Sequence, residues 1–113
     1  MNNLASIWLS TLREWKGMSM SELAFELRRR VENDVKVSST TISEAEKGYA
    51  SPKTWILLAQ FFQWPIDFVL WAAGELGNMA PSKDELIEKI EDNLNELPPD
   101  VRKKLVRDLG LDK

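Results

Sequence analysis

Apolar residues recur at spacings of three and four over short segments of this chain, and a glycine or proline closes most of these segments. This period places the apolar side chains on one face of an α-helix, while the helix breakers keep each helix short. Residues 3–16 illustrate the pattern, because Leu4, Trp8 and Leu12 share one helical face and Gly17 follows as a stop signal. The sequence therefore predicts an all-α fold made of short helices.

A second helix is expected to begin at Ser19, whose hydroxyl can form a capping box with Glu22. We expect this helix to fray at residues 32–34, where turn-forming residues gather. The following residues 37–42 are rich in β-branched side chains, which is typical of a strand. Their hydroxyls also suit helix capping, and the spacing of the apolar residues favours a third helix at about 39–47.

Two further helices are expected in the first 74 residues. Ser51 and Pro52 supply an N-cap and a first helical residue for the fourth helix, while Pro65 and Gly74 bound the fifth. In the second to fifth helices, the residues expected to point inward are Leu23, Ala24, Leu27, Val31, Ile42, Ala45, Trp55, Leu58, Ala59, Phe62, Phe68, Val69 and Ala72. The sequence therefore predicts one five-helix domain over residues 1–76.

Residues 77–81 predict a linker, and residues 82–113 predict a helical C-terminal extension. Ser82 and Glu85 match a second capping box. An apolar stripe then runs along one helix face and consists of Leu86, Ile87, Ile90, Leu94 and Leu97. A proline pair ends this helix, and Asp100 is expected to cap a last short one. The stripe either packs within the chain or forms a dimer seam, and we favour the seam.

The chain contains no Cys and no His, which excludes thiol nucleophiles, zinc sites of the Cys/His type and imidazole acid–base chemistry. We therefore expect neither an enzyme nor a bound cofactor or metal. The first residues do not form a signal peptide, and no apolar stretch approaches the ~20 residues that span a bilayer. The sequence favours a cytoplasmic protein with no membrane contact.

The net charge of −3 is unevenly distributed. Residues 1–74 carry eight basic and eight acidic side chains, whereas residues 75–113 carry seven basic and ten acidic ones. Bulk positive charge therefore does not attract this chain to nucleic acid. The one basic cluster of the first part is Arg28, Arg29 and Arg30. It either complements a helix dipole or reaches a phosphate, and we favour the dipole.

Several patterns follow one another in an order that matches a known family. They are LREWKGMS (12–19), VSSTTISEAEKG (37–48), LLAQFF (57–62) and WPIDFVL (64–70). Together they resemble the lambda-repressor/Cro-like (XRE) helix-turn-helix family, and the resemblance covers residues 4–74. One departure is a surplus of about eight residues within 28–37. The resemblance implies a five-helix lambda-repressor-like DNA-binding domain.

The resemblance also implies that the third helix lies in the major groove of duplex DNA and reads base edges with its first residues. The positions that match are Ser39, Thr40, Ser43 and Glu44. Hydroxyls can donate or accept at base edges, and a carboxylate can accept from cytosine N4. The alternative for the hydroxyls is helix capping, which they suit equally well.

Phosphate contacts are implied at helix starts and at nearby polar side chains. The candidates are Ser19, Met20, Lys47, Tyr49, Ser51 and Lys53. Lys47 and Lys53 equally suit the alternative of ordinary solvated lysines. Arg13 and Glu46 match positions that form an ion pair in the family, so we assign them a structural role.

Four tryptophans raise the alternative of stacking on single-stranded bases, namely Trp8, Trp55, Trp64 and Trp71. Aromatic residues at helical spacing are mostly core residues, so we favour packing. Trp71 is the exception, because it could join an exposed apolar patch with the extension.

The sequence thus predicts a sequence-specific transcriptional regulator that binds double-stranded DNA as a homodimer. The alternative is a protein-interaction module of the same fold, an antirepressor or antitoxin-like partner binder that uses the C-terminal extension. A hydrolase using isolated carboxylates is disfavoured.

Overall fold

The structure, a computed structural model, describes residues 3–30 and 37–112. Its helices are α1 (Leu4–Trp15), α2 (Met20–Arg30), α3 (Ser39–Glu46), α4 (Pro52–Phe62), α5 (Ile66–Ala72), the 3₁₀ turn η1 (Gly77–Met79), α6 (Lys83–Asn95) and α7 (Pro99–Asp108). The described residues contain no strand, so the all-α prediction is confirmed and residues 39–46 are helical. The expectations for Val31 and for fraying at 32–34 lie outside the described residues.

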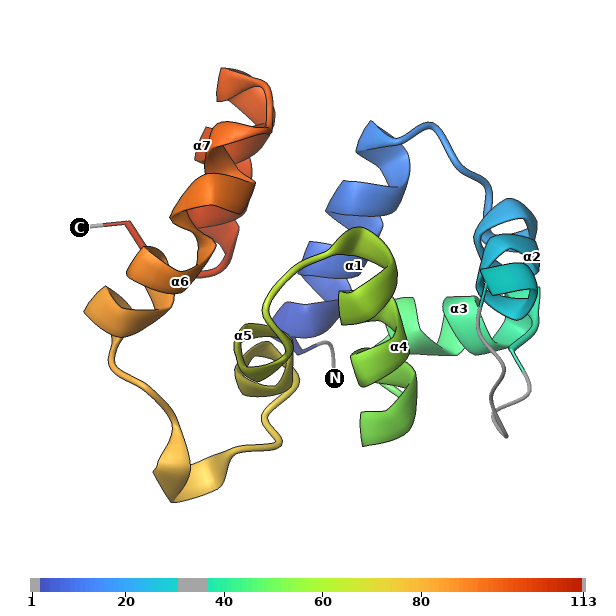
Figure 1. Cartoon of the computed structure of the whole chain (residues 1–113), viewed down its shortest axis with the longest axis horizontal. Helices are drawn as coiled ribbons and strands as arrows, with labels where there is room; N and C mark the ends of the chain where they lie inside the picture. Colours follow the sequence, from blue (N-terminus) through green and yellow to red (C-terminus); the bar gives the residue numbers. More distant parts are fainter. Residues whose placement is uncertain (1–2, 31–36, 113) are drawn as a thin grey trace.

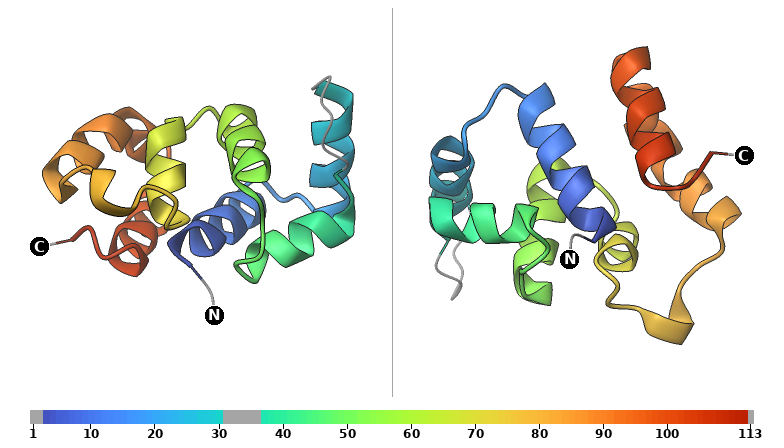
Figure 2. Two further views of the ribbon diagram at one scale, coloured as in Figure 1. Left: turned by 90° about the horizontal axis from the view of Figure 1, so that it is seen from below. Right: turned by 180° about the vertical axis from the view of Figure 1, so that it is seen from behind.

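The helices form two layers (Figure 1). Figure 2 shows α1, α3 and α7 side by side in one layer and α4, α5 and α6 in the other, with α2 at the edge beside α3. α1 is the centre of the fold, because it packs against α3, α4, α5 and α7. Any segment fixed to α1 is therefore fixed to the whole molecule.

Helix starts follow the sequence signals closely. The hydroxyl of Ser51 accepts from the amide of Thr54 at 3.3 Å, and Pro52 is the first residue of α4. The hydroxyl of Ser82 accepts from the amide of Glu85 at 3.2 Å. These local bonds satisfy amides that a helix leaves without a partner at its start.

One continuous core includes the C-terminal extension. Leu86, Ile90, Leu94 and Leu97 are buried, and α6 packs on α5 while α7 packs on α1. The preference for a dimer seam along this stripe is therefore wrong, because the stripe packs within a single chain. Burial within the chain removes the apolar area that a seam would need.

The tryptophans mostly belong to this core. Trp8, Trp55 and Trp64 are buried, and the rings of Trp8 and Trp64 meet edge to face with their centroids 5.9 Å apart. Trp71 is half-buried, with its ring centroid 5.8 Å from that of Phe68. Packing is thus the correct alternative for Trp8, Trp55 and Trp64, since a buried ring offers no face to a base.

Two details of the extension differ from expectation. Asp100 lies in the first turn of α7 and does not cap it, because Pro98 occupies the cap position and Pro99 the first helical one. Within the expected linker 77–81, residues 77–79 form the turn η1. No helix among the described residues is long and apolar enough to cross a membrane.

Candidate nucleic-acid interface

α3 begins with a capping box built from its own hydroxyls. The Ser38 side chain accepts from the Thr41 amide at 3.3 Å, and the Thr41 hydroxyl accepts from the Ser38 amide at 3.1 Å. Sequence reasoning did not single out these two residues, although Ser38 stands directly before the helix. Ser38 and Thr41 therefore cap α3, and the candidate base-reading residues Ser39 and Thr40 do not.

Ser39 and Thr40 are exposed at the leading end of α3. Within the part of the chain that the structure describes, neither hydroxyl makes a hydrogen bond, so both are free to donate and accept. Ser43 and Glu44 are half-buried farther along the same helix, while Ile42 and Ala45 anchor its opposite side in the core. α3 thus presents polar groups outward from an apolar anchor.

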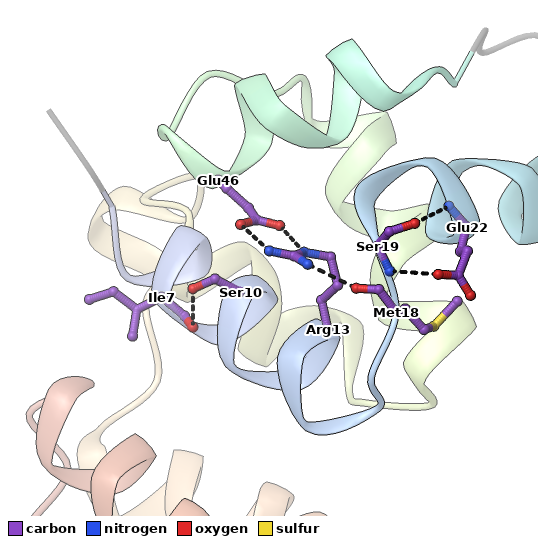
Figure 3. A network of polar contacts seen from close by, with 7 residues as sticks. All are labelled: Ile7, Ser10, Arg13, Met18, Ser19, Glu22 and Glu46. Atoms are coloured by element: carbon purple, nitrogen blue, oxygen red, sulfur yellow. Dashed lines mark hydrogen bonds and ion pairs between the residues drawn. The ribbon is translucent and has the colours of Figure 1, made fainter.

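An ion pair fixes α3 to α1, as expected. The Arg13 Nε donates to Glu46 Oε2 at 2.5 Å and its Nη2 donates to Oε1 at 3.1 Å, while Nη1 donates to the Met18 carbonyl at 2.8 Å (Figure 3). Only 14% of the Arg13 side chain and 12% of the Glu46 side chain are exposed. The hydrogen bonds that Arg13 donates to the Glu46 carboxylate raise the pKa of Arg13 above its ordinary value. One guanidinium therefore positions both the end of α3 and the turn that leads to α2.

The start of α2 is capped, which leaves fewer of its polar groups available to bind a phosphate. The Ser19 hydroxyl accepts from the Glu22 amide at 3.0 Å, and the Ser19 amide donates to the Glu22 carboxylate at 3.2 Å. The Met20 side chain is half-buried against the core. A phosphate here would meet the Ser19 O–H and the Met20 amide, because the Ser19 amide is engaged by Glu22.

The other phosphate candidates follow α3 directly along the chain. Lys47 and Tyr49 are exposed in the turn after α3, and Ser51 and Lys53 are exposed at the start of α4. The Ser51 hydroxyl also caps α4. The candidate residues therefore lie at the starts of α2, α3 and α4 and at the end of α3. The Arg13–Glu46 ion pair links α1 directly to the end of α3.

The arginine cluster has a structural explanation for two of its members. Arg28 Nη1 donates to the Val37 carbonyl at 2.6 Å, which fastens the return of the chain from the inserted segment to α2. Arg29 pairs with Glu26 at 2.8 Å on the same helix. The side chain of Arg30 lies outside the described residues. Sequence reasoning missed the Arg28 contact, since it depends on where the insertion returns.

A groove of about 840 Å³ opens between α2 and the end of α4. Met18, Phe61 and Phe62 contribute apolar surface, and Phe25 stands at its side with 56% of the residue exposed. Glu22, Glu26 and Glu96 and the cations Lys16 and Arg29 complete its lining. Phe25 is the one signal in the sequence that could have indicated this groove, because it is a large apolar residue off the inward face of α2.

The described ranges contain no visible metal-binding centre. No group of carboxylates among residues 3–30 and 37–112 is arranged to hold a metal ion. Comparison of the chain with models of protein families, with curated proteins and with solved structures finds no match.

Proposed function

We propose that this protein is a lambda-repressor-like (XRE-type) helix-turn-helix protein that binds double-stranded DNA sequence-specifically and regulates transcription in the cytoplasm. The observation that carries the proposal is the leading end of α3, where Ser39 and Thr40 are exposed and free of capping bonds. Residues 1–76 supply the DNA-binding unit in this proposal.

The physical basis is a rigid reading helix with unused polar groups. Placed in a major groove, Ser39 and Thr40 offer hydroxyls to base edges, and the Glu44 carboxylate can accept from cytosine N4. Lys47 and Lys53 are exposed on either side of the turn after α3 and suit phosphate contacts. The Arg13–Glu46 pair holds the helix in one orientation.

A homodimer on two half-sites belongs to the same proposal, because two-fold symmetry doubles a modest set of base contacts. The apolar stripe of α6 is buried, so the two copies must meet through another surface. Neither catalysis nor a cofactor is part of the proposal.

Titration of a fluorescent duplex pool of random sequence, followed by anisotropy at about 50 and 200 mM salt, tests the proposal. We expect saturable binding at the lower salt concentration and weakening at the higher one, because each phosphate contact releases condensed counterions on binding. The variant Lys47→Ala/Lys53→Ala should bind every duplex more weakly, with its fold unchanged. A flat wild-type titration at the lower salt concentration would contradict the proposal.

The groove beside Phe25 favours a second candidate function, the protein-interaction module. A groove that combines an apolar floor, charged walls and an exposed aromatic ring can receive an amphipathic helix. This candidate now depends on α2 and α4, because the stripe of the extension is buried. A chain that binds no duplex, and whose one detected partner is lost in a Phe25→Ser variant, would support it.

A further inference from the structure

The two helices of the extension carry opposite charge. α7 has four basic residues and two acidic ones, whereas α6 has two basic residues and five acidic ones. On α7, Lys103, Lys104 and Arg107 are exposed. Within the described chain Lys103 and Lys104 have no ion-pair partner. The acidic surplus of the extension thus lies on α6, and α7 presents a basic face.

The fold separates these charges between its layers. α7 lies with α1 and α3, while α6 lies with α4 and α5 (Figure 2). α7 packs on α1 through buried Leu105, and α1 also holds α3 through Arg13 and Glu46. The basic face is therefore fixed relative to the candidate reading helix.

The distance between α7 and α3 suits a duplex. Packed helices lie about 8–10 Å apart, so α7 lies roughly 20 Å from the end of α3 that contacts α1. The start of α3 lies farther from α7, at the edge of the molecule beside α2 (Figure 2). One turn of duplex DNA is about 34 Å long. A duplex that receives α3 in its major groove can bring a phosphate within reach of α7 without any change in the fold.

We infer that the basic face of α7, formed by Lys103, Lys104 and Arg107, is a second contact for the phosphate backbone of the duplex that α3 reads. This inference rests on the proposed function and adds a surface outside the helix-turn-helix domain. It also explains how a chain of net charge −3 holds a polyanion, because the acidic helix α6 lies in the other layer of the fold. Phosphate contacts carry no base information, so this surface contributes affinity and not sequence choice.

The test compares Lys103→Ala/Lys104→Ala with a control of equal charge change, Lys83→Glu at the start of α6. Both variants alter exposed side chains, and a glutamate in the first turn of α6 suits the helix dipole. Binding to a duplex of about three helical turns is measured by anisotropy over a series of salt concentrations. Circular dichroism and thermal melts establish that the folds are equal.

Each phosphate contact contributes about 0.9 to the slope of log K against log salt, so the double variant should lose about one to two units of slope. Its affinity near 50 mM salt should fall about tenfold for every duplex sequence, while Lys83→Glu keeps the wild-type slope. The variant Lys103→Arg/Lys104→Arg should restore binding, because it keeps both charges.

An unchanged slope in the alanine variant would overturn the inference while leaving the proposed function intact. An equal loss of slope in Lys83→Glu would also overturn it, because the effect would then follow net charge and not position. Failure of the wild-type chain to bind any duplex would reject the proposed function, and the inference with it.

Discussion

The junction of α1 with α3 and the junction of α5 with α6 are both bridged by an ion pair, but the two pairs differ in burial. Arg13 and Glu46 expose 14% and 12% of their side chains and share two hydrogen bonds. Asp67 and Lys89 expose 40% and 42%. Solvent therefore screens the second pair far more strongly than the first.

The apolar contacts of the two helices explain this difference. α3 has eight residues and buries two apolar side chains, Ile42 and Ala45, whereas α6 buries Leu86, Ile90 and Leu94. The bidentate Arg13–Glu46 pair adds a directional polar contact to this small apolar anchor and to the packing of α3 on α2. The orientation of the reading helix thus depends on polar geometry as well as on packing, while the extension is held mainly by hydrophobic burial.

The largest loss is expected from breaking the buried pair. Arg13→Ala leaves Glu46 without its partner and should lower the free energy of unfolding by about 3 to 5 kcal/mol. Replacing both residues, Arg13→Met with Glu46→Leu, should recover much of this loss, because no buried charge remains unpaired. Urea unfolding measures both values. If Arg13→Ala lowered the free energy of unfolding less than Asp67→Asn does, the buried ion pair would not be the stronger of the two.

A substitution in α7 tests whether hydrophobic burial holds the C-terminal extension to the rest of the fold. Leu105→Ala removes a fully buried side chain facing α1 and should cost about 3 kcal/mol. Since α7 shares the core of α1, the variant and the wild type should each unfold in one transition. Far-UV circular dichroism and tryptophan fluorescence should give the same midpoint. Two separate midpoints would show that the extension is an independent unit.

The turn that leads from α4 to α5 should be stabilised by relieving its backbone. Gln63 adopts a left-handed conformation with φ of 61°, and its carbonyl accepts from the Asn93 side chain at 3.0 Å. Gln63→Gly should raise stability by about 0.5 to 1 kcal/mol, because glycine adopts this conformation without a steric penalty. Gln63→Ala is the control and should give no such gain in a thermal melt.

The smallest effect is expected at the exposed pair, and it depends on pH. The hydrogen bond from Lys89 lowers the pKa of Asp67 below its ordinary 3.8, and the same contact raises the pKa of Lys89 above its ordinary 10.5. The pair therefore stabilises fully between these ordinary values. Its contribution is lost as pH falls through the lowered pKa of Asp67 or rises through the raised pKa of Lys89.

Asp67→Asn should accordingly reduce the melting temperature slightly at pH 7. This difference should shrink as pH falls through the lowered pKa of Asp67, and also as salt is added. A difference that persists unchanged in 1 M salt would show that the pair is not screened as its exposure implies.

Local signals predicted most of this fold. Ser19, Ser51 and Ser82 mark the starts of α2, α4 and α6, because a cap acts within its own helix turn. The surface against which an apolar stripe packs cannot be predicted from the residues of its own helix. In α6, the same spacing of apolar residues suits both a dimer seam and the surface of α5. Only the contacts between helices in the folded chain show that the stripe packs on α5.

The candidate site divides in the same way. The Arg13–Glu46 pair was expected from the resemblance, and its geometry is present. Which hydroxyls cap α3 could not be settled beforehand, because Ser38, Ser39, Thr40 and Thr41 are chemically alike. The backbone conformation of Ser38 makes it the cap and leaves Ser39 and Thr40 exposed. The contact of Arg28 with Val37 depends on the path of the insertion, which spacing alone does not predict.

The leading end of α3 is best examined by selecting bound duplexes from a random pool with the wild type and with Ser39→Ala and Glu44→Ala variants. Each variant should fold normally and shift the preferred base at one or two positions, with discrimination of about 1–3 kcal/mol lost per base contact. Selected sequences identical to those of the wild type, at equal affinity, would contradict base reading by this helix.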